Sequence, residues 1–263
     1  MADSFFTVDG DVFVPTDLAR GPWDPKACHA GPPTGLMVRA LEAALPELRL
    51  ARISVDLGRP VPMGGFTVHA EVVRAGRVTG NTRVAIIDRD GNERVTATGM
   101  HVGVARVPLF EQRLDNTGVN TPRLADAIPG EFPIGPFRHG LPGFRNAVEV
   151  RYPDGEDDRP GATTVWMRTV SLLVGEEPSP FQRICSLADC GNAFSRHAEP
   201  DQVQFVNTDL VVALHRDPVG EWLGSRAVST WQPTGVGLAD ALLFDDDGPV
   251  GRSLQTLLLR PAP

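Results

Sequence analysis

An aspartate in an apolar stretch is the first candidate for chemistry in this sequence. Asp189 stands among apolar residues that recur at helical spacing between Phe181 and Phe194. A carboxylate in such surroundings loses hydration, so its pKa should be raised. A raised pKa suits a general base, or a nucleophile that forms an anhydride. The alternative is a helix carboxylate that points to solvent or pairs with Arg183 or Arg196.

Two amide side chains in predicted strands are the next candidates. Gln255 lies in the apolar run 253–259, where an amide is either solvated or satisfied by a buried partner. Its oxygen can orient a water molecule, and its N–H groups can hold a carboxylate. Asn207 has the same dual capacity. The alternative for both residues is a polar side chain on a solvated strand face.

A turn rich in glycine and proline precedes a predicted helix in the first half of the chain. Gly31 and Gly35 flank the start of that helix, where unpaired N–H groups and the positive end of the helix dipole can hold an anionic oxygen. Glycine also permits a close approach of substrate. The alternative is an ordinary helix start. His29 either orients a substrate or caps the loop.

Several other kinds of site are excluded by their missing motifs. The histidines do not form an HExxH pattern or a comparable ligand spacing, so we expect no metal. The chain contains no GxSxG, no phosphate-binding loop and no GxGxxG after a strand, and we expect no cofactor. The acidic run 245–248 lacks the later glutamate ligand of a calcium loop and is typical of a hairpin turn.

The elements that must position these residues form two similar halves. The first half begins with a hairpin around Asp9-Gly10 and continues with a helix over 35–45 that Pro46 ends. The second half begins with a hairpin over 147–167, and its helix extends from Pro178 to about Arg196. The predicted strands after the two helices are 52–57, 66–73, 81–88, 94–104, 203–214, 222–230, 237–244 and 251–259.

The repeat itself is the most informative feature of the chain. Glu42 and Asp189 occupy matching helix positions, and Asp56 and Asp209 occupy matching strand positions. Each half is one long helix against a mainly antiparallel sheet, which defines an α+β class. We expect modules over 1–106 and 145–263, joined by a linker over 107–144 with little regular structure.

Composition limits the class of protein. The 263 residues contain 25 Lys+Arg and 33 Asp+Glu, a net charge of −8, which argues against a nucleic-acid-binding surface. No apolar stretch approaches the roughly 18 residues that span a bilayer, and the N-terminus lacks the features of a signal peptide. Cys28, Cys185 and Cys190 do not suggest a disulfide framework. We therefore expect a reduced cytoplasmic protein.

A sheet wrapped round one central helix, twice in one chain, is similar to the double hotdog fold. The sequence resembles the acyl-CoA thioesterase II family and its actinobacterial thioesterase-like relatives. The likeness rests on the helix start 29–35, on 187–189, on the strand 206–216 with 220–222, and on 254–256. It spans roughly residues 5–105 and 145–260. The resemblance implies a double hotdog thioesterase.

In that family, an aspartate, a threonine or serine, and a glutamine bind and activate one water molecule that hydrolyses an acyl-CoA thioester. Carried over by position, the resemblance implies Asp189, Asn207 and Gln255 as catalytic residues. It implies substrate contacts for Gly31, His29, Gly35 and Thr208. Asn207 departs from the pattern, because it stands where the hydroxyl residue belongs. Thr208 is adjacent but would face the other way on a regular strand.

Three hypotheses follow. The first is an acyl-CoA thioesterase with Asp189 as the base. The second is another thioester-handling hotdog enzyme, either a dehydratase or hydratase, for which His29 is the candidate partner of the acid, or a biosynthetic enzyme acting on a carrier-bound acyl chain. The third is a protein that binds acyl thioesters without turnover. The edge strands and apolar outer face of hotdog sheets also predict a homodimer or a dimer of dimers.

Overall fold

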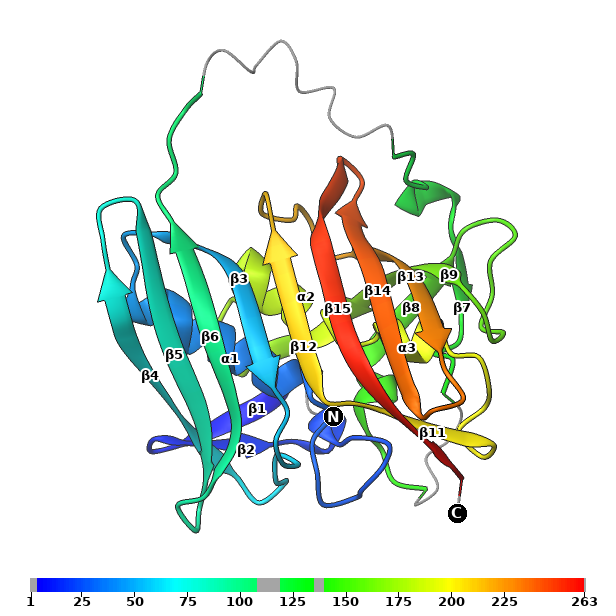
Figure 1. The fold of residues 1–263 in the computed structure, drawn as a ribbon, viewed down its shortest axis with the longest axis horizontal. Helices are drawn as coiled ribbons and strands as arrows, with labels where there is room; N and C mark the ends of the chain where they lie inside the picture. The colour runs from blue at the N-terminus through cyan, green and yellow to red at the C-terminus, as the bar shows by residue number, and fades with distance from the viewer. Residues whose placement is uncertain (1–3, 108–118, 135–139, 263) are drawn as a thin grey trace.

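One long, strongly curved sheet forms the frame of the molecule (Figure 1). The computed structural model describes residues 4–107, 119–134 and 140–262. Along the sheet the strands follow the order β10-β1-β2-β4-β5-β6-β3-β12-β15-β14-β13-β9-β8-β7, and β11 also pairs with β15. The helices lie behind the sheet in the view of Figure 1, so one face of the sheet covers them and the other faces outward.

The N-terminal half contains the expected hairpin, helix and strands. Its strands are β1 (Ser4–Asp9), β2 (Val12–Pro15), β3 (Arg49–Asp56), β4 (Phe66–Ala75), β5 (Thr79–Asp88) and β6 (Glu93–Val102). The hairpin around Asp9-Gly10 is confirmed by the antiparallel pairing of β1 with β2. A short 3-10 turn, η1 (Asp17–Ala19), precedes the helix. Helix α1 (Gly31–Ala44) begins earlier than the predicted 35–45, because Pro32 and Pro33 fit a first helical turn.

The C-terminal half repeats this order. Its strands are β8 (Val148–Tyr152), β9 (Thr163–Thr169), β10 (Ser171–Leu173), β11 (Val203–Asn207), β12 (Asp209–Leu214), β13 (Leu223–Trp231), β14 (Val236–Asp245) and β15 (Gly248–Pro261). The predicted single strand over 203–214 is divided at Thr208, so that β11 pairs with β15 and β12 pairs with both β15 and β3.

The single helix predicted from Pro178 to Arg196 is interrupted. Helix α2 (Pro180–Ala188) ends with Asp189 as its C-cap, and a short helix α3 (Gly191–Phe194) follows. The main-chain carbonyl of Asp189 accepts a hydrogen bond from Gln255 Nε2 at 3.0 Å rather than continuing the helical ladder. A buried side chain from β15 therefore holds the break in place.

The predicted linker 107–144 is in part regular structure. It contains a 3-10 turn, η3 (Leu124–Asp126), and a strand, β7 (Ile128–Gly130), which pairs with β8 at the end of the sheet. A second turn, η4 (Phe144–Ala147), leads into β8. The expectation of little regular structure is therefore wrong for 128–130. Residues 108–118 and 135–139 of this segment lie outside the described residues.

The two halves share one sheet and one core. Strands β3 and β12 pair antiparallel with Asp56 opposite Asp209, the two positions matched by the repeat. Helices α1 and α2 pack against each other behind this seam. A continuous apolar cluster includes Leu36, Met37 and Leu41 of α1 as well as Phe181 and Ile184 of α2. The start of α1 is thereby held beside the end of α2.

Candidate active site

A cavity of about 260 Å³ opens beside the junction of α2 and α3. Both halves of the chain contribute to its wall, through the loop 21–30, the segment 57–61, the segments 132–134 and 144–145, α3 and the end of β11. Most of the wall is apolar and includes Trp23, Val61, Phe132, Phe144 and Phe205. Such a cavity suits an apolar ligand whose orientation is fixed by a few polar groups.

Asp189 places its carboxylate in the wall of this cavity with only 3% of the residue exposed. Burial raises its pKa from 3.8 to about 7, although hydrogen bonds from Asn207, Gln255 and the Gly31 N–H favour the charged form. The carboxyl group therefore changes charge near neutral pH. This behaviour matches the sequence prediction of a raised pKa and suits a general base.

Asn207 contacts the carboxylate from the last position of β11. Its Nδ2 donates to Asp189 Oδ1 at 2.7 Å, and the residue lines the cavity. Thr208 is exposed, and its hydroxyl donates to the Thr256 carbonyl at 3.3 Å instead. The strand alternation thus brings Asn207 to Asp189 and turns Thr208 away from the cavity.

Gln255 lies behind Asp189, seen from the cavity. It is 1% exposed and is not among the residues that line the cavity. Its Nε2 donates to Asp189 Oδ1 and to the Asp189 carbonyl, both at 3.0 Å. Its Oε1 accepts the main-chain N–H of Asn192 at 3.1 Å. Because both ends of the amide are engaged with protein groups, its direct effect is on the position of Asp189 and Asn192.

His29 faces the second carboxylate oxygen. Its Nδ1 lies 3.2 Å from Asp189 Oδ2, and its ring stacks on Phe144 with centroids 3.9 Å apart and planes at 9°. Burial lowers the pKa of His29 to about 3, so the imidazole is neutral at physiological pH. Because the Gly31 N–H donates to the same nitrogen, Nδ1 cannot also donate, so this contact is a hydrogen bond when the Asp189 carboxyl is protonated and donates to Nδ1. The histidine ring forms part of the cavity wall.

The two predicted glycines serve the packing of α1 against α2. A Cβ atom at Gly31 would lie 2.3 Å from the Ser186 carbonyl oxygen of α2, and one at Gly35 would lie 3.2 Å from the Gln182 carbonyl oxygen of α2. Neither glycine is among the cavity-lining residues, and the Gly31 N–H donates to His29 Nδ1 at 3.2 Å. Gly31 therefore positions the histidine. Gly35 packs within α1 away from the cavity wall, and its substrate contact stays a prediction.

Asn192 is a polar residue of the cavity wall that sequence reasoning missed. It follows Asp189 by three residues, and residues at i and i+3 lie on the same face of a continuous helix. That spacing was a usable signal, because the sequence predicts one helix through both residues.

The cysteines do not supply a nucleophile. Cys28 lines the cavity, but burial raises the pKa of its thiol to about 12. Burial also raises the pKa values of Cys185 and Cys190 well above the usual range. These groups are therefore thiols at neutral pH, and the thiolate is the reactive form. Within the described residues, no group of His, Cys, Asp and Glu side chains is arranged to hold a metal ion.

Comparison with known families identifies the family of the chain and the class of reaction it catalyses. Residues 19–102 match the sequence model of the acyl-CoA thioesterase N-terminal domain, and residues 123–259 match that of the C-terminal domain. The chain belongs to the acyl-CoA thioesterase family. It is a thioester hydrolase with the predicted acyl-CoA class of substrate. No curated protein matches the sequence of this thioesterase.

Solved structures share the fold of this thioesterase at low sequence identity. A hot dog protein of unknown function from Alicyclobacillus acidocaldarius superposes with a TM-score of 0.74 at 19% identity, over 98% of this chain and 96% of that one. A TesB protein from Mycobacterium avium subspecies paratuberculosis gives 0.66 at 17% identity, over 97% and 94%. Acyl-CoA thioesterase II TesB2 of Mycobacterium marinum gives 0.59 at 18%, over the same shares. The predicted double hotdog fold is confirmed.

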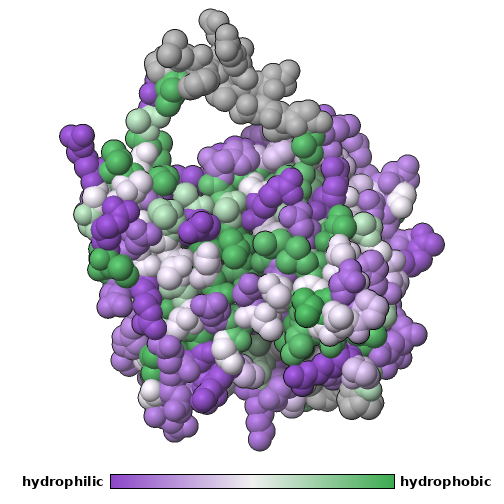
Figure 2. All heavy atoms as spheres, viewed as in Figure 1, coloured by the Kyte–Doolittle hydropathy of each residue, from purple (hydrophilic) through white to green (hydrophobic). Residues whose placement is uncertain are grey.

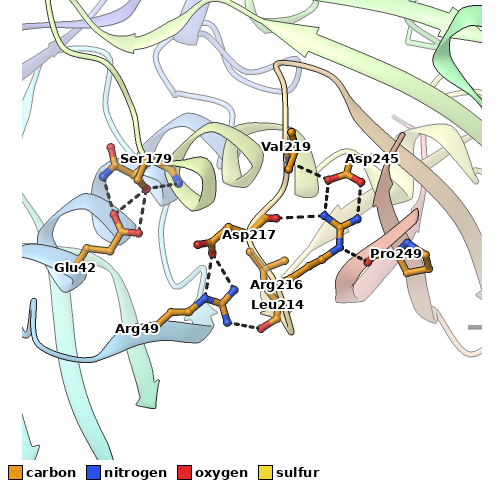
Figure 3. Close-up of polar contacts among 10 residues, drawn as sticks. Glu42, Arg49, Ser179, Leu214, Arg216, Asp217, Val219, Asp245 and Pro249 are labelled. Carbon is orange, nitrogen blue, oxygen red and sulfur yellow. Dashed lines mark hydrogen bonds and ion pairs between the residues drawn. The ribbon is translucent and has the colours of Figure 1, made fainter. Parts of the chain in front are cut away.

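The repeat of this thioesterase also places a carboxylate in the other half, and Figure 3 shows its surroundings. Glu42 of α1 meets the start of α2, where Ser179 Oγ donates to Glu42 Oε2 at 2.9 Å and Gln182 Nε2 donates to the same oxygen at 2.7 Å. Burial raises the pKa of Glu42. However, Glu42 does not line the cavity described above, so its contacts join the two helices.

Two ion pairs stabilise the frame of this thioesterase (Figure 3). One joins the two halves, and the other lies within the second half. Arg49 of β3 donates from Nη2 to Asp217 Oδ1 at 2.9 Å, which ties the first half to the loop after β12. Arg216 donates to both carboxylate oxygens of Asp245, which is 1% exposed. These pairs hold the frame around the helices and stand apart from the cavity.

Across the described part of the chain, no helix has the length and apolarity needed to cross a bilayer.

Proposed function

We propose that this thioesterase hydrolyses acyl-CoA thioesters with a water molecule that Asp189 deprotonates. The observation that carries the proposal is a nearly buried carboxylate, in the wall of a mainly apolar cavity, with two amide donors fixed on one oxygen. Asn207 and Gln255 both donate to Oδ1. We assign the proton transfer to Oδ2, which receives neither amide.

The reaction then proceeds by addition and elimination. Asp189 takes a proton from water, and the water oxygen forms a bond to the thioester carbon. The carbonyl electron pair moves to its oxygen and returns when the C–S bond breaks. The sulfur of CoA leaves with the bond's electron pair and takes the proton from Asp189. The products are the free acid and CoA, and the carboxylate is regenerated.

Asn207 supports this step in place of a hydroxyl residue. Its Nδ2 is used by Asp189 Oδ1, so its Oδ1 remains available as an acceptor for the second hydrogen of the attacking water. An amide can therefore both hold the base and orient the nucleophile. Gln255 acts as a positioning residue through its contacts with Asp189 and Asn192.

A panel of acyl-CoA substrates with a thiol-trapping dye tests the proposal. Asp189→Asn should lower kcat by roughly 10²–10⁴-fold, the usual contribution of a general base. Gln255→Ala should also lose most activity, because Asp189 then loses two hydrogen bonds. Glu42→Gln is the matched control, since it neutralises the corresponding half-buried carboxylate outside the cavity. Unchanged hydrolysis after Asp189→Asn would falsify the mechanism, and tight binding without release of CoA would indicate a binding protein.

A second candidate function is hydration or dehydration of an acyl thioester. It is favoured by the 3.2 Å contact between His29 Nδ1 and Asp189 Oδ2, since dehydration normally needs a histidine paired with an acid. The discriminating measurement is the product formed from a trans-2-enoyl-CoA. Appearance of 3-hydroxyacyl-CoA without free CoA would support this candidate, whereas free CoA from saturated acyl-CoA supports hydrolysis.

We also propose that the protein assembles with itself through the outer face of the sheet. Figure 2, in the same view as Figure 1, shows hydrophobic side chains gathered over the middle of the sheet. We define the sheet-face patch as Val228, Leu238, Leu254 and Leu258, which are 48%, 43%, 39% and 38% exposed. Exposed apolar patches of this kind mark interaction surfaces. A second copy of the chain is the expected occupant, giving a homodimer or a dimer of dimers.

A further inference from the structure

Asn192 places an unpaired amide in the cavity wall. The residue belongs to α3, is 8% exposed and lines the same cavity as Asp189. In the described part of the chain, its side-chain Oδ1 and Nδ2 make no hydrogen bond with another protein group. In the same part of the chain, neither atom is a fully enclosed polar atom without a partner, so both remain accessible from the cavity. An amide with no protein partner in a mainly apolar wall is a site for a polar group of a ligand.

The backbone of Asn192 is fixed relative to Asp189. Its main-chain N–H donates to Gln255 Oε1 at 3.1 Å, and the same glutamine donates to Asp189 Oδ1 at 3.0 Å. One buried side chain thus sets the spacing between the carboxylate and Asn192. This arrangement is preorganised, because neither residue needs the ligand in order to adopt its position.

The start of α1 supplies fewer donors than a usual helix N-terminus. Pro32 and Pro33 have no N–H group. The Gly31 N–H donates to His29 Nδ1 at 3.2 Å, and the Thr34 N–H donates to the Ala30 carbonyl at 3.1 Å. Hydrolysis of a thioester nevertheless requires donors at the carbonyl oxygen, where negative charge develops. Asn192 supplies a side-chain donor in the same wall as the main chain of Ala30.

We propose that Asn192 Nδ2 donates a hydrogen bond to the carbonyl oxygen of the bound thioester and stabilises the oxyanion that forms there. When water adds to the carbon, the carbonyl electron pair moves onto this oxygen, and the Asn192 N–H faces the new charge. When the C=O bond re-forms, the C–S bond breaks and the sulfur leaves with its electron pair. This assignment rests on the proposed hydrolysis and names a further catalytic residue for it.

The test compares Asn192→Ala and Asn192→Asp with the wild-type protein. Loss of one oxyanion donor lowers kcat by about 10²–10³-fold, and we expect that loss with KM changed by less than about threefold. Asn192→Asp keeps the shape of the side chain and replaces the donor with an acceptor, so it should be at least as impaired. Asn120→Ala, at an exposed asparagine that does not line the cavity, is the control for activity.

A thioether analogue of acyl-CoA, which lacks the carbonyl oxygen, separates this role from other contacts. Its Kd should be the same for wild type and Asn192→Ala, because the proposed partner atom is absent. A parallel rise in KM and in the Kd of the thioether would overturn the proposal, since Asn192 would then contact the CoA moiety. Unchanged kcat would overturn it as well.

The remaining outcomes separate a folding defect, a failure of this assignment and a failure of the proposed function. If Asn192→Ala fails to fold, the better-matched Asn192→Asp variant decides the question by its kcat. If the wild-type protein releases CoA but the asparagine variants are unaffected, only this inference fails. If the wild-type protein releases CoA from none of the acyl-CoAs, the proposed function fails and this assignment fails with it.

Discussion

At the scale of residues, the central feature is a carboxylate that ionises only near neutral pH. Asp189 has a pKa of about 7 because burial outweighs its hydrogen bonds from Asn207 and Gln255. Burial raises the pKa of Asp189 to a value that suits a base. Burial of the ionised carboxylate also lowers the free energy of unfolding. Sites of this kind exchange stability for activity.

This exchange predicts a pH-dependent gain of stability in Asp189→Asn. The carboxyl loses its proton near pH 4 in the unfolded chain and near pH 7 in the folded chain, so between these values the folded state binds more protons. The contribution of Asp189 to the free energy of unfolding therefore falls as pH rises from 4 to 7. We expect the variant to be more stable by on the order of 4 kcal/mol at pH 8 and equal at pH 4.

Urea unfolding of both proteins at these two pH values measures the difference. An asparagine at this position can keep the hydrogen bonds from Asn207 and Gln255 and can donate its own N–H to His29 Nδ1. A variant less stable than wild type at pH 8 would contradict the account, because burial of charge would then not be the dominant effect.

The site residues differ in how far the sequence reveals them. Asp189 and Gln255 could be singled out from the sequence, because a charged or amide side chain in an apolar run is either solvated or satisfied by a buried partner. Only the structure shows that both are buried. The sequence offered His29 as a candidate partner of the acid, but the contact with Asp189 appears only in the structure, since it joins the start of one helix to the end of another in the other half of the chain. The free amide of Asn192 depends on which neighbours satisfy it, and one sequence does not contain that information.

At the scale of elements, the packing of α1 against α2 controls the site. Gly31 allows the start of α1 to approach the Ser186 carbonyl, and its N–H fixes His29. The sequence suggested a substrate contact for Gly31 and Gly35, but a close helix contact needs the same residue type. Spacing along the chain could not distinguish these roles, because the partner helix lies far away in sequence.

Gly31→Ala should therefore destabilise the protein and impair the site. The added Cβ would lie 2.3 Å from a main-chain oxygen, so one of the helices must shift. Overpacking of this kind costs about 1–3 kcal/mol. Gly64→Ala is the control, because a Cβ there meets no atom within 4 Å and the residue is not in a left-handed conformation. Thermal unfolding compares the two, and an equal melting temperature for Gly31→Ala and wild type would rule out the close contact.

The break between α2 and α3 shows another limit of sequence reasoning. The spacing of apolar residues continues through Asp189 to Phe194, and it predicted one helix. The structure ends α2 at Ala188, because Gln255 takes the Asp189 carbonyl. The spacing of apolar residues in 181–194 cannot predict a hydrogen bond to the main chain from a strand much later in the sequence.

At the scale of the whole molecule, the repeat was the most reliable prediction. Matching positions such as Asp56 and Asp209 face each other across the seam between β3 and β12. The strand β7 was missed because Ile128-Pro129-Gly130 contains two residues that usually interrupt strands. It lies at the end of the sheet, where a proline is tolerated.

The sheet-face patch predicts self-association that charge can disrupt. Leu254→Lys together with Leu258→Lys places two cations in the middle of the patch, where desolvation in an interface is costly. We expect sedimentation at micromolar concentration to show an oligomer for wild type and a monomer for the double variant. Val104→Lys, at a residue that is 77% exposed outside the patch, should leave the assembly unchanged. A monomeric wild-type protein would refute this surface.

The most direct test of the catalytic assignment is the rate of CoA release as a function of pH, for wild type and Asp189→Asn with the same acyl-CoA. Because the base must be ionised, we predict that kcat/KM of the wild type rises with pH through an apparent pKa of about 7 and then levels. The variant should be slower by roughly 10²–10⁴-fold and lack this inflection. A variant that keeps the wild-type rate, or the same inflection near pH 7, would show that another group activates the water.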